Sequence, residues 1–330
     1  MNFSLLKLQK IVVFLLLSNG FISIPSKAQT IDSSIDTTYR HSILLQIDND
    51  AFFATDAYYT AGIDLEYRRL VKNENWLRSV FKNPDGKLTV GYRYGFKIFT
   101  PFEISEDAYL NGSQDRPYAG IQFLNGRISY FPKDDKGHEF GLLIGTVGER
   151  AGMGRLQRSF HRAINTLLPF GWENQISNEW VTNLQYKYWR EVPFGQATTI
   201  ISESEVVVGT AQSFINQSSL IRIGKFSPIR HTSFAGSRLG KKSKMTAIED
   251  YAFLGLGISH VFHNIFIEGS LFDNPSPFTV KAKKWLFSQQ FGFQYSYSKL
   301  AFRFVLSHVG AEFVEGKSHF RMRLKVWRRF

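Results

Sequence analysis

The last strand-length segment of the chain alternates between apolar and polar residues. From Phe320 to Phe330 every second residue is apolar or aromatic, apart from Arg328, and the residues between them carry four positive charges. A period of two predicts a β-strand with two unlike faces. One face suits hydrocarbon and the other needs water or counter-charges, as in the strands of outer-membrane barrels. The two faces are Phe320, Met322, Leu324, Val326 and Phe330 on one side, and Arg321, Arg323, Lys325, Trp327 and Arg329 on the other.

The same alternation recurs in thirteen segments separated by turn-rich gaps. No proline or glycine breaks the pattern at Val261, so we merge the two segments around it into one long, kinked strand. Twelve strands result, and bacterial single-chain barrels use an even number. The sequence therefore predicts an all-β fold, a transmembrane antiparallel β-barrel without exposed sheet edges. The predicted strands are 42–49, 60–70, 87–99, 117–131, 137–147, 180–190, 198–212, 216–226, 250–272, 285–298, 300–312 and 319–330.

Parity places the connections between these strands. With the N-terminus in the periplasm, alternate connections face outward, and the outward ones should be the longer. The basic segment 227–249 falls on the periplasmic side, where its length fits poorly. The outward segments are 50–59, 100–116, 148–179, 213–215, 273–284 and 313–318, and the periplasmic segments are 71–86, 132–136, 191–197, 227–249 and 299.

The longest outward segment contains a helical pattern over residues 151–168. Apolar residues recur at a spacing of three or four and form one stripe, with a polar stripe beside it. Pro169 and Gly171 then end the helix. A plain pore has little need of a docked amphipathic helix that carries a histidine. The apolar stripe is Met153, Leu156, Phe160, Ile164 and Leu167, and the polar stripe is Gln157, His161 and Asn165.

The start of the chain has the pattern of a secretory signal. Lys7 and Lys10 precede a short apolar run at 11–17, and 26–28 is a small-x-small cleavage site. The run is too short for a membrane helix, and no later stretch reaches the roughly 18 apolar residues that one needs. We therefore expect a signal peptide at 1–28, a periplasmic N-terminal segment at 29–41 and the barrel domain at 42–330.

Composition agrees with an exported β-protein. The chain has no Cys, which excludes disulfides, a thiol nucleophile and thiolate metal sites. Aromatic residues make up 15% of the chain, enough for aromatic girdles at two membrane interfaces. The net charge of +12 suits anionic lipid head groups, and the sequence contains no nucleic-acid-binding motif.

Candidate chemistry lies near the outward ends of the strands. Asp48-Asn49-Asp50 suits a hard cation such as Ca²⁺, although ordinary turn chemistry is the commoner explanation. The spacing to Asp56 lacks the mid-loop Gly and final Glu of an EF-hand, which excludes that motif. His161 is either a packing residue, the commoner case, or a general base, because imidazole titrates near neutral pH.

Six motifs in order along the mature chain carry a resemblance to a known family. The chain resembles the outer-membrane lipid A deacylases, specifically the 3′-O-deacylases that trim lipopolysaccharide. The motifs are DND (48–50), TDxxYTxG (55–62), DRPYAG (115–120), FH (160–161) within the helix, GWxNQxxNE (171–179) and VFHNIFIEG (261–269).

The resemblance implies a twelve-stranded barrel with its active site between the wall and an outer-loop helix. It implies hydrolysis of the ester that holds the acyloxyacyl group at the 3′ position of lipid A, with Ca²⁺ as cofactor. By motif, Asn49 and Asp50 would hold calcium and stabilise the oxyanion, and His161 would be the base that activates water. Thr60 would be a polar contributor near them.

The residue types support this chemistry independently of the resemblance. A Lewis-acid metal with a general base suffices for ester hydrolysis without a covalent intermediate, and no Ser-His-Asp arrangement is evident. Basic residues on outward segments are either phosphate ligands for lipid A or solvated charges. They are Arg116, Arg150, Lys281, Lys283 and Lys284.

The sequence departs from the family pattern at two places. Ala61 stands where the family usually has Asn, and Leu167 and Leu168 stand where it tends to carry an acid. Glu173 and Glu179 are candidate replacements for that acid.

Two other functions therefore stay open. The lost acid favours a non-enzymatic barrel used for adhesion, transport or structure, and the same chemistry also suits an outer-membrane phospholipase. For the deacylase we expect lipid A or lipopolysaccharide and outer-membrane lipids as partners, a monomer, and an outward-facing site.

Overall fold

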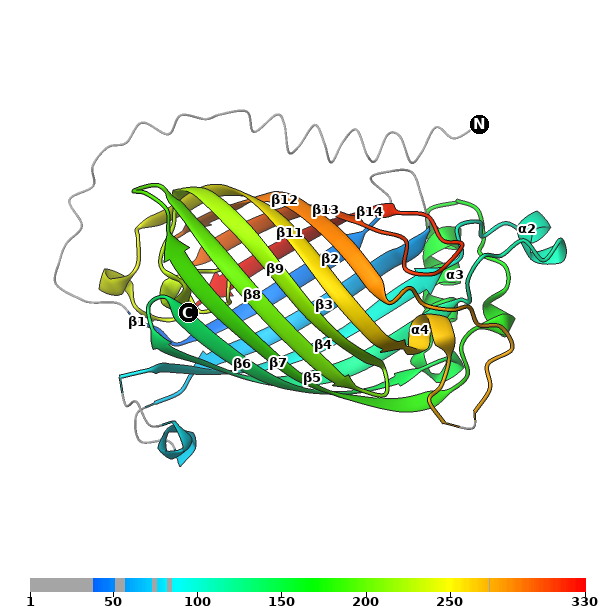
Figure 1. Cartoon of the computed structure of the whole chain (residues 1–330), viewed down its shortest axis with the longest axis horizontal. Coiled ribbons are helices and arrows are strands. Elements are labelled where there is room, and N and C mark those ends of the chain that lie inside the picture. Colours follow the sequence, from blue (N-terminus) through cyan, green and yellow to red (C-terminus); the bar gives the residue numbers. More distant parts are fainter. Residues whose placement is uncertain (1–37, 51–56, 73–75, 82–84, 273) are drawn as a thin grey trace.

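The computed structural model describes residues 38–50, 57–72, 76–81, 85–272 and 274–330, and its main body is one antiparallel β-barrel (Figure 1). The barrel strands are β2 (His41–Asn49), β3 (Tyr58–Leu70), β4 (Lys87–Thr100), β5 (Ala119–Lys133), β6 (Lys136–Val147), β7 (Glu179–Pro193), β8 (Thr198–Gly209), β9 (Gln212–Lys225), β11 (Ile248–Asn264), β12 (Trp285–Tyr297), β13 (Leu300–Val309) and β14 (His319–Arg329).

Each barrel strand pairs with its neighbours in the chain, and β14 pairs with β2 to close the ring. The prediction of a twelve-stranded transmembrane barrel with a loop helix is therefore confirmed. The smaller elements are α2 (Glu106–Leu110), α3 (Met153–Ala163), α4 (Ile265–Glu268), 3₁₀ helices at Trp76–Val80, Glu149–Ala151, Trp172–Asn174, Ile229–His231 and Lys242–Lys244, and a two-stranded sheet of β1 (Thr38–Tyr39) and β10 (Gly240–Lys241).

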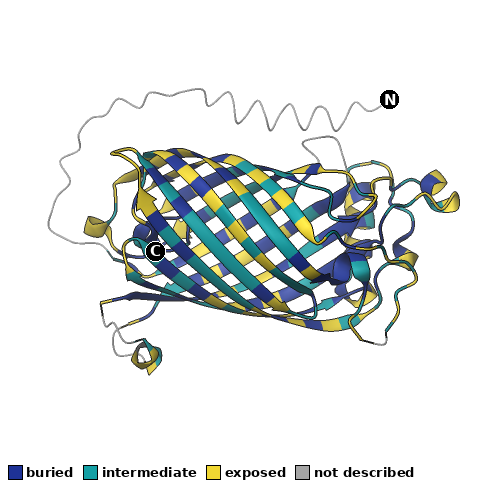
Figure 2. Ribbon diagram, viewed as in Figure 1, coloured by how far each residue is buried: buried dark blue, intermediate teal, exposed yellow. Residues whose placement is uncertain are grey.

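Side chains alternate across the barrel wall as the sequence pattern predicts (Figure 2). On β2, Ile43, Leu45 and Ile47 are exposed on the outside, while Gln46 and Asp48 are buried inside. The C-terminal strand follows the same rule, with its basic face turned inward and its terminal aromatic residue exposed. Strand alternation thus produces an apolar outer surface and a polar interior.

The two ends of the barrel differ. We call them the α3 end, which carries the three α-helices, and the β1 end, where the small sheet and the C-terminus lie (Figure 1). The predicted outward connections all fall at the α3 end and the predicted periplasmic ones at the β1 end. The turn between β8 and β9 lies at 210–211 rather than 213–215, and several other strand ends differ from the prediction by one to three residues.

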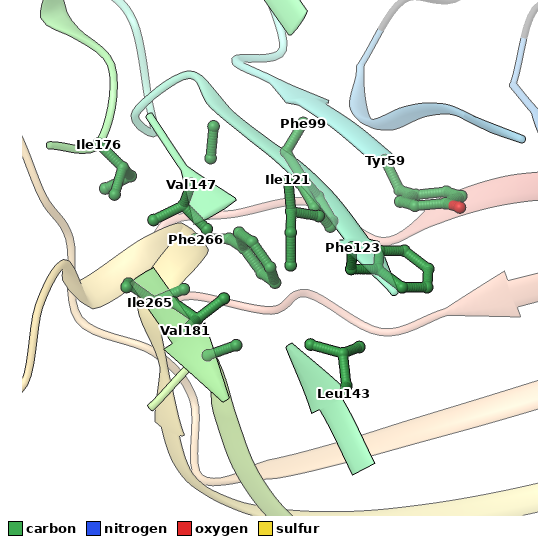
Figure 3. Close-up of a cluster of buried hydrophobic side chains, with 12 residues drawn as sticks. Tyr59, Phe99, Ile121, Phe123, Leu143, Val147, Ile176, Val181, Ile265 and Phe266 are labelled. Atoms are coloured by element: carbon green, nitrogen blue, oxygen red, sulfur yellow. The ribbon is translucent and has the colours of Figure 1, made fainter. Parts of the chain in front are cut away.

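The merged strand at 250–272 is confirmed in its first part and wrong in its second. Strand β11 passes Val261 with a bulge in its pairing to β9, but ends at Asn264. Asn264 caps helix α4 by accepting the Phe266 N–H at 3.2 Å, which turns the chain across the barrel mouth. Ile265 and Phe266 then pack among inward-facing residues of several strands, so an apolar cluster fills this mouth (Figure 3).

The basic segment between β9 and β11, at residues 226–247, folds into the opposite mouth. Lys87 from the first position of β4 donates to the carbonyl oxygens of Arg230 and Ser237 at 2.5 and 2.9 Å, and to Nδ1 of His231 at 2.9 Å. Phe234 of this segment lines the barrel interior. A connection of this length is unexpected at the β1 end, where short turns are the rule. Its inward packing explains its length.

The described residues contain no helix that is long and apolar enough to cross a membrane. The predicted signal peptide and most of the N-terminal segment lie outside the described residues, as does Asp56.

Candidate active site

A groove of about 740 Å³ lies between helix α3 and the outer wall of the barrel. The outward ends of β2, β3 and β4 form one side, and α3 with the residues after it forms the other. The predicted site residues Asn49, Thr60 and His161 all line this groove. Its apolar lining includes Ile47, Ile63, Phe96, Ile98, Leu156, Phe160, Ile164 and Leu167.

Alternation along β2 splits the Asp48-Asn49-Asp50 motif. Asp48 points into the barrel, where the Arg323 guanidinium donates to its two oxygens at 2.7 and 2.9 Å. Asn49 is half-buried and lines the groove on the outer side. Asp50 is 1% exposed, and its Oδ2 accepts the N–H of Ala57, a groove residue, at 2.7 Å. The Asp48 carboxylate therefore stabilises the barrel interior, Asn49 lines the groove, and Asp50 is buried next to it.

A β-bulge in β3 brings Thr60 to the groove. The pairing of β3 with β4 shifts between Tyr59 and Ala61, which leaves Thr60 as the extra residue. The Thr60 and Thr100 hydroxyl groups share a hydrogen bond of 2.7 Å, and the Thr60 carbonyl accepts the Asp50 N–H at 3.3 Å. The bulge thus ties the ends of β2 and β3 together beneath the groove.

Two glycines let helix α3 lie close to the barrel. A Cβ on Gly120 of β5 would lie 2.4 Å from the Met153 Cβ, and a Cβ on Gly154 would lie 2.8 Å from the Trp172 ring. Trp172, which is 1% exposed, donates from Nε1 to Oε1 of Gln157 at 2.8 Å. The DRPYAG and GWxNQ motifs therefore hold the helix in place.

The end of α3 positions His161. Asn165 adopts a left-handed conformation with φ of 52°, and its N–H donates to the Arg162 carbonyl at 3.2 Å. The next N–H, of Thr166, donates to the His161 carbonyl at 3.0 Å, which completes a Schellman motif. The reversed chain brings the Leu167 carbonyl within 2.5 Å of His161 Nδ1. The helix ends earlier than predicted, since Asn165 reverses the chain before Pro169 is reached.

This contact fixes the proton arrangement of the histidine. A carbonyl oxygen only accepts hydrogen bonds, so His161 Nδ1 carries the proton. In the neutral ring Nε2 is then the basic nitrogen. His161 is 4% exposed, so the ring is held in a fixed orientation at the groove wall.

Helix α3 turns its polar stripe inward. Gln157 and His161 are buried against the barrel, whereas Leu156 and Phe160 are 41% and 57% exposed and line the groove. An apolar stripe normally packs against the protein core. Here only Met153 packs inward, and the rest of the stripe forms one wall of a groove whose other wall is the outer surface of the barrel.

Comparison with known proteins identifies the family. A protein-family profile described as "Outer membrane protein LpxR" matches residues 11–323. The chain belongs to the LpxR family. The solved structure of LpxR from Salmonella typhimurium is similar to it, with a TM-score of 0.71, 17% sequence identity, and coverage of 88% of this chain and 100% of that chain. The likeness shows that the LpxR barrel fold is shared.

Other solved barrels are less similar. The β-domain of the Bordetella autotransporter BrkA has a TM-score of 0.48 and 8% identity, covering 89% of this chain and 99% of its own. The KdgM porin has a TM-score of 0.38 and 7% identity, with 88% and 99% coverage. These values carry no functional argument. A search of curated protein sequences found no match.

Both departures from the LpxR-type sequence pattern lie in the groove. Ala61 is directly opposite Asn49 across the β2–β3 pair, and Leu167 lines the groove beside His161. Neither candidate replacement acid is in the groove lining: Glu173 lines a separate hollow on the far side of α3, and Glu179 begins β7.

An acid that the sequence analysis did not single out does line the groove. Glu103 lies in the connection between β4 and β5, and its side chain is exposed. Its spacing from the other site residues follows no recognised motif, and the fold alone brings it to them. Glu103 is therefore the exposed acid of the groove lining, whereas Asp48, which also borders the groove, is buried and paired with Arg323.

Arg116 fits neither of the two alternatives considered for it, phosphate ligand or solvated charge. Arg116 is 1% exposed, where it donates to the Phe266 carbonyl at 2.9 Å and pairs with Glu312 at 3.4 Å. Its guanidinium also lies over the Phe99 ring. Burial lowers the pKa of Arg116, whereas the nearby carboxylates of Glu312 and Asp115 raise it. Burial is the stronger effect, so the pKa of Arg116 falls below its usual value. Arg116 thus joins the connections at the α3 end instead of facing a ligand.

The oxygen-bearing groups at and next to the groove are of the chemical types that bind calcium. Ca²⁺ takes carboxylate, amide and hydroxyl oxygens, which Asp50, Glu103, Asn49 and Thr60 supply. Within the described part of the chain no three His, Cys, Asp or Glu side chains converge on one metal position. A calcium site here would therefore depend on amide, hydroxyl and backbone oxygens as well as carboxylates.

Proposed function

We propose that this LpxR-family protein is an outer-membrane hydrolase that removes the 3′-linked acyloxyacyl group from lipid A, with His161 as general base. The observation that carries the proposal is the position of His161. Its Nδ1–H is tied to the Leu167 carbonyl, and it lines an apolar groove together with Asn49 and Thr60.

The groove suits a membrane lipid. Ile47 and Ile63 lie on the outer wall of the barrel, which faces hydrocarbon, and Phe160 forms the opposite wall. Acyl chains of a lipid in the same leaflet reach such a groove sideways without leaving an apolar environment. With the α3 end facing outward, this leaflet is the one that holds lipid A.

In the proposed reaction, Nε2 of His161 takes a proton from a water molecule as its oxygen attacks the ester carbonyl carbon. When the tetrahedral intermediate collapses, the bond between the acyl carbon and the glucosamine oxygen breaks. His161 then returns the proton to that oxygen. Asn49 donates from its amide to the oxyanion. The reaction consumes one water molecule and releases one carboxylic acid and the free hydroxyl group of the glucosamine.

Calcium is part of the proposal. Asn49 and Asp50 would hold it, and the bound ion would polarise the ester carbonyl.

The lipid A phosphates have candidate partners beside the groove. Arg155 and Arg158 line the hollow of about 420 Å³ on the far side of α3. Arg150 and Lys281 are also exposed at this end of the barrel. We propose these residues as phosphate ligands in place of the buried Arg116.

The test is a mass spectrum of lipid A from cells that express the chain, beside cells that express His161→Ala. We expect loss of one acyloxyacyl unit with the wild type and intact lipid A with the variant. His308→Ala is the matched control, because His308 lies on β13 away from the groove and should leave the deacylated product unchanged.

A second arm separates the alternatives. Chelation of calcium from purified protein should abolish deacylation, and added calcium should restore it. Intact lipid A in every sample, with correctly folded barrels and calcium supplied, would contradict the proposal. Cleaved glycerophospholipids beside intact lipid A would instead identify a phospholipase.

A further inference from the structure

Two basic residues face each other inside the barrel. Arg303 of β13 and Lys325 of β14 are direct partners in the strand register, and both line a chamber in the lumen. Like charges directly opposite on a sheet destabilise it. Arg323, two residues before Lys325 on the same face of β14, adds a third positive charge.

The neighbouring carboxylates are committed to other cations. Asp48 binds Arg323 at 2.7 Å. Glu66 binds Arg68 and Arg93 at 2.9 and 2.7 Å. Within the described ranges, neither Arg303 nor Lys325 forms an ion pair within 4.0 Å, and the carboxylates of Glu249 and Asp48 act on them only from a longer distance while paired with Arg238 and Arg323.

Arg303 is held by contacts that do not neutralise it. It is 5% exposed, and its Nε donates to Gln294 Oε1 at 2.8 Å. Its guanidinium carbon lies 4.7 Å from the Phe234 ring centroid and 5.4 Å from that of Trp327. Its Nη1 donates to the Phe234 carbonyl at 3.4 Å, and the Tyr251 hydroxyl lies near the guanidinium, but its buried Nη2 makes no hydrogen bond of good geometry to a described protein atom. The Nη2 donor of Arg303 and the positive charge of its guanidinium group are therefore available to a ligand.

The chamber has room for such a ligand. Its volume is about 180 Å³, and its lining contains seven Arg or Lys side chains and three carboxylates. A water molecule takes about 30 Å³, so an ion and several waters fit. The apolar cluster around Phe266 lies toward the α3 end, and Phe234 of segment 226–247 is part of the chamber lining. Electrostatic forces between partly desolvated groups are stronger than in bulk water.

We propose that the barrel binds a small inorganic anion in this chamber, between Arg303 and Lys325. The anion compensates the paired positive charges and accepts a hydrogen bond from Arg303 Nη2. This site lies inside the wall, apart from the groove that carries the proposed hydrolysis.

The test is crystallography of the full barrel with two anomalous scatterers, sodium bromide in one set of crystals and sodium selenate in another. We expect an anomalous peak between Arg303 and Lys325. A bromide peak would assign a monovalent halide, and a selenate peak a tetrahedral dianion of the sulfate type. Absence of a peak in both salts would overturn the proposal.

Matched variants extend the test to solution. Lys325→Met removes the cross-strand repulsion, so it should fold, and Lys299→Met removes one exposed charge at the β12–β13 turn. At constant ionic strength, the Tm of wild type and Lys299→Met should rise when gluconate is replaced by the anion that gives the peak. Lys325→Met should lose at least half of that rise. An equal rise in all three proteins would contradict the assigned position.

Discussion

At the scale of single residues, a backbone carbonyl orients the histidine. The side chain at position 167 is leucine, yet its carbonyl accepts the His161 Nδ1–H and fixes the same tautomer that a carboxylate would. A neutral carbonyl stabilises a protonated imidazole less than a carboxylate does, so His161 depends more on other charges at the groove. Glu103 is the exposed acid that lines it.

Replacement of Glu103 by Gln should lower the rate of lipid A deacylation by about tenfold, because outer partners of catalytic groups and metal ligands typically carry effects of that size. The rate is measured with purified protein in mixed micelles at saturating calcium. Glu315→Gln is the control, since Glu315 is exposed in the connection between β13 and β14, lines neither the groove nor the hollow beside α3, and should keep the wild-type rate. Equal rates for both variants would remove Glu103 from the site.

Residue types could be predicted at the groove, but their surroundings could not. Asn49, Asp50, Thr60 and His161 stand in motifs with a fixed order, and three of the four line the groove while Asp50 is buried next to it. The Leu167 carbonyl leaves no trace in the sequence because every residue has one. Glu103 reaches the groove through a loop of irregular structure, which no periodicity describes.

At the scale of elements, the two ends of helix α3 determine where His161 lies. Its start packs on Gly120, and its last turn ends in a Schellman motif that folds the chain back toward His161. Strands were predictable because membrane and lumen impose a strict period of two. The helix boundary was not, because the termination depends on one left-handed residue, Asn165, that also fits a helical polar stripe.

Asn165→Val should lower deacylation severalfold, because a β-branched residue at positive φ costs about 1–2 kcal/mol and shifts the Leu167 carbonyl. Asn165→Gly should stay within about twofold of the wild type, since glycine adopts this conformation freely. Both are measured as initial rates, with the Tm of each barrel as a control for global folding. Similar rates for the Val and Gly variants would show that the left-handed turn does not position His161.

At the scale of the whole molecule, the barrel is filled and covered at both ends. The apolar cluster around Phe266 fills the α3 end, and segment 226–247 packs into the β1 end. The sequence pattern placed this basic segment at the correct end. Its inward packing could not be predicted, because its contacts join residues more than 140 positions apart, such as Lys87 and His231.

Acid should loosen segment 226–247. Burial and the nearby charges of Lys87 and Arg230 lower the pKa of His231 from 6.5 to about 3, although Asp134 lies 3.7 Å from its Nε2. The opened segment therefore binds a proton more readily than the packed one, and packing loses stability as pH falls below 6.5. At pH 5 the loss is about 2 kcal/mol.

Hydrogen exchange of this segment at pH 7.5 and pH 5 measures the effect, after correction for the intrinsic rates. We expect less protection at pH 5 in the wild type, and a much smaller difference in His231→Gln, whose amide stays neutral. Equal protection at the two pH values in the wild type would contradict the prediction.

The covered mouths have a consequence for the cell. A wide barrel with open ends conducts ions and leaks small solutes, as porins do. Here α4 and its apolar neighbours lie across one mouth and the segment with Phe234 across the other. We expect such a barrel to carry no steady current in a planar lipid bilayer. A bacterium can then hold many copies at its surface without lowering the permeability barrier against antibiotics and bile salts.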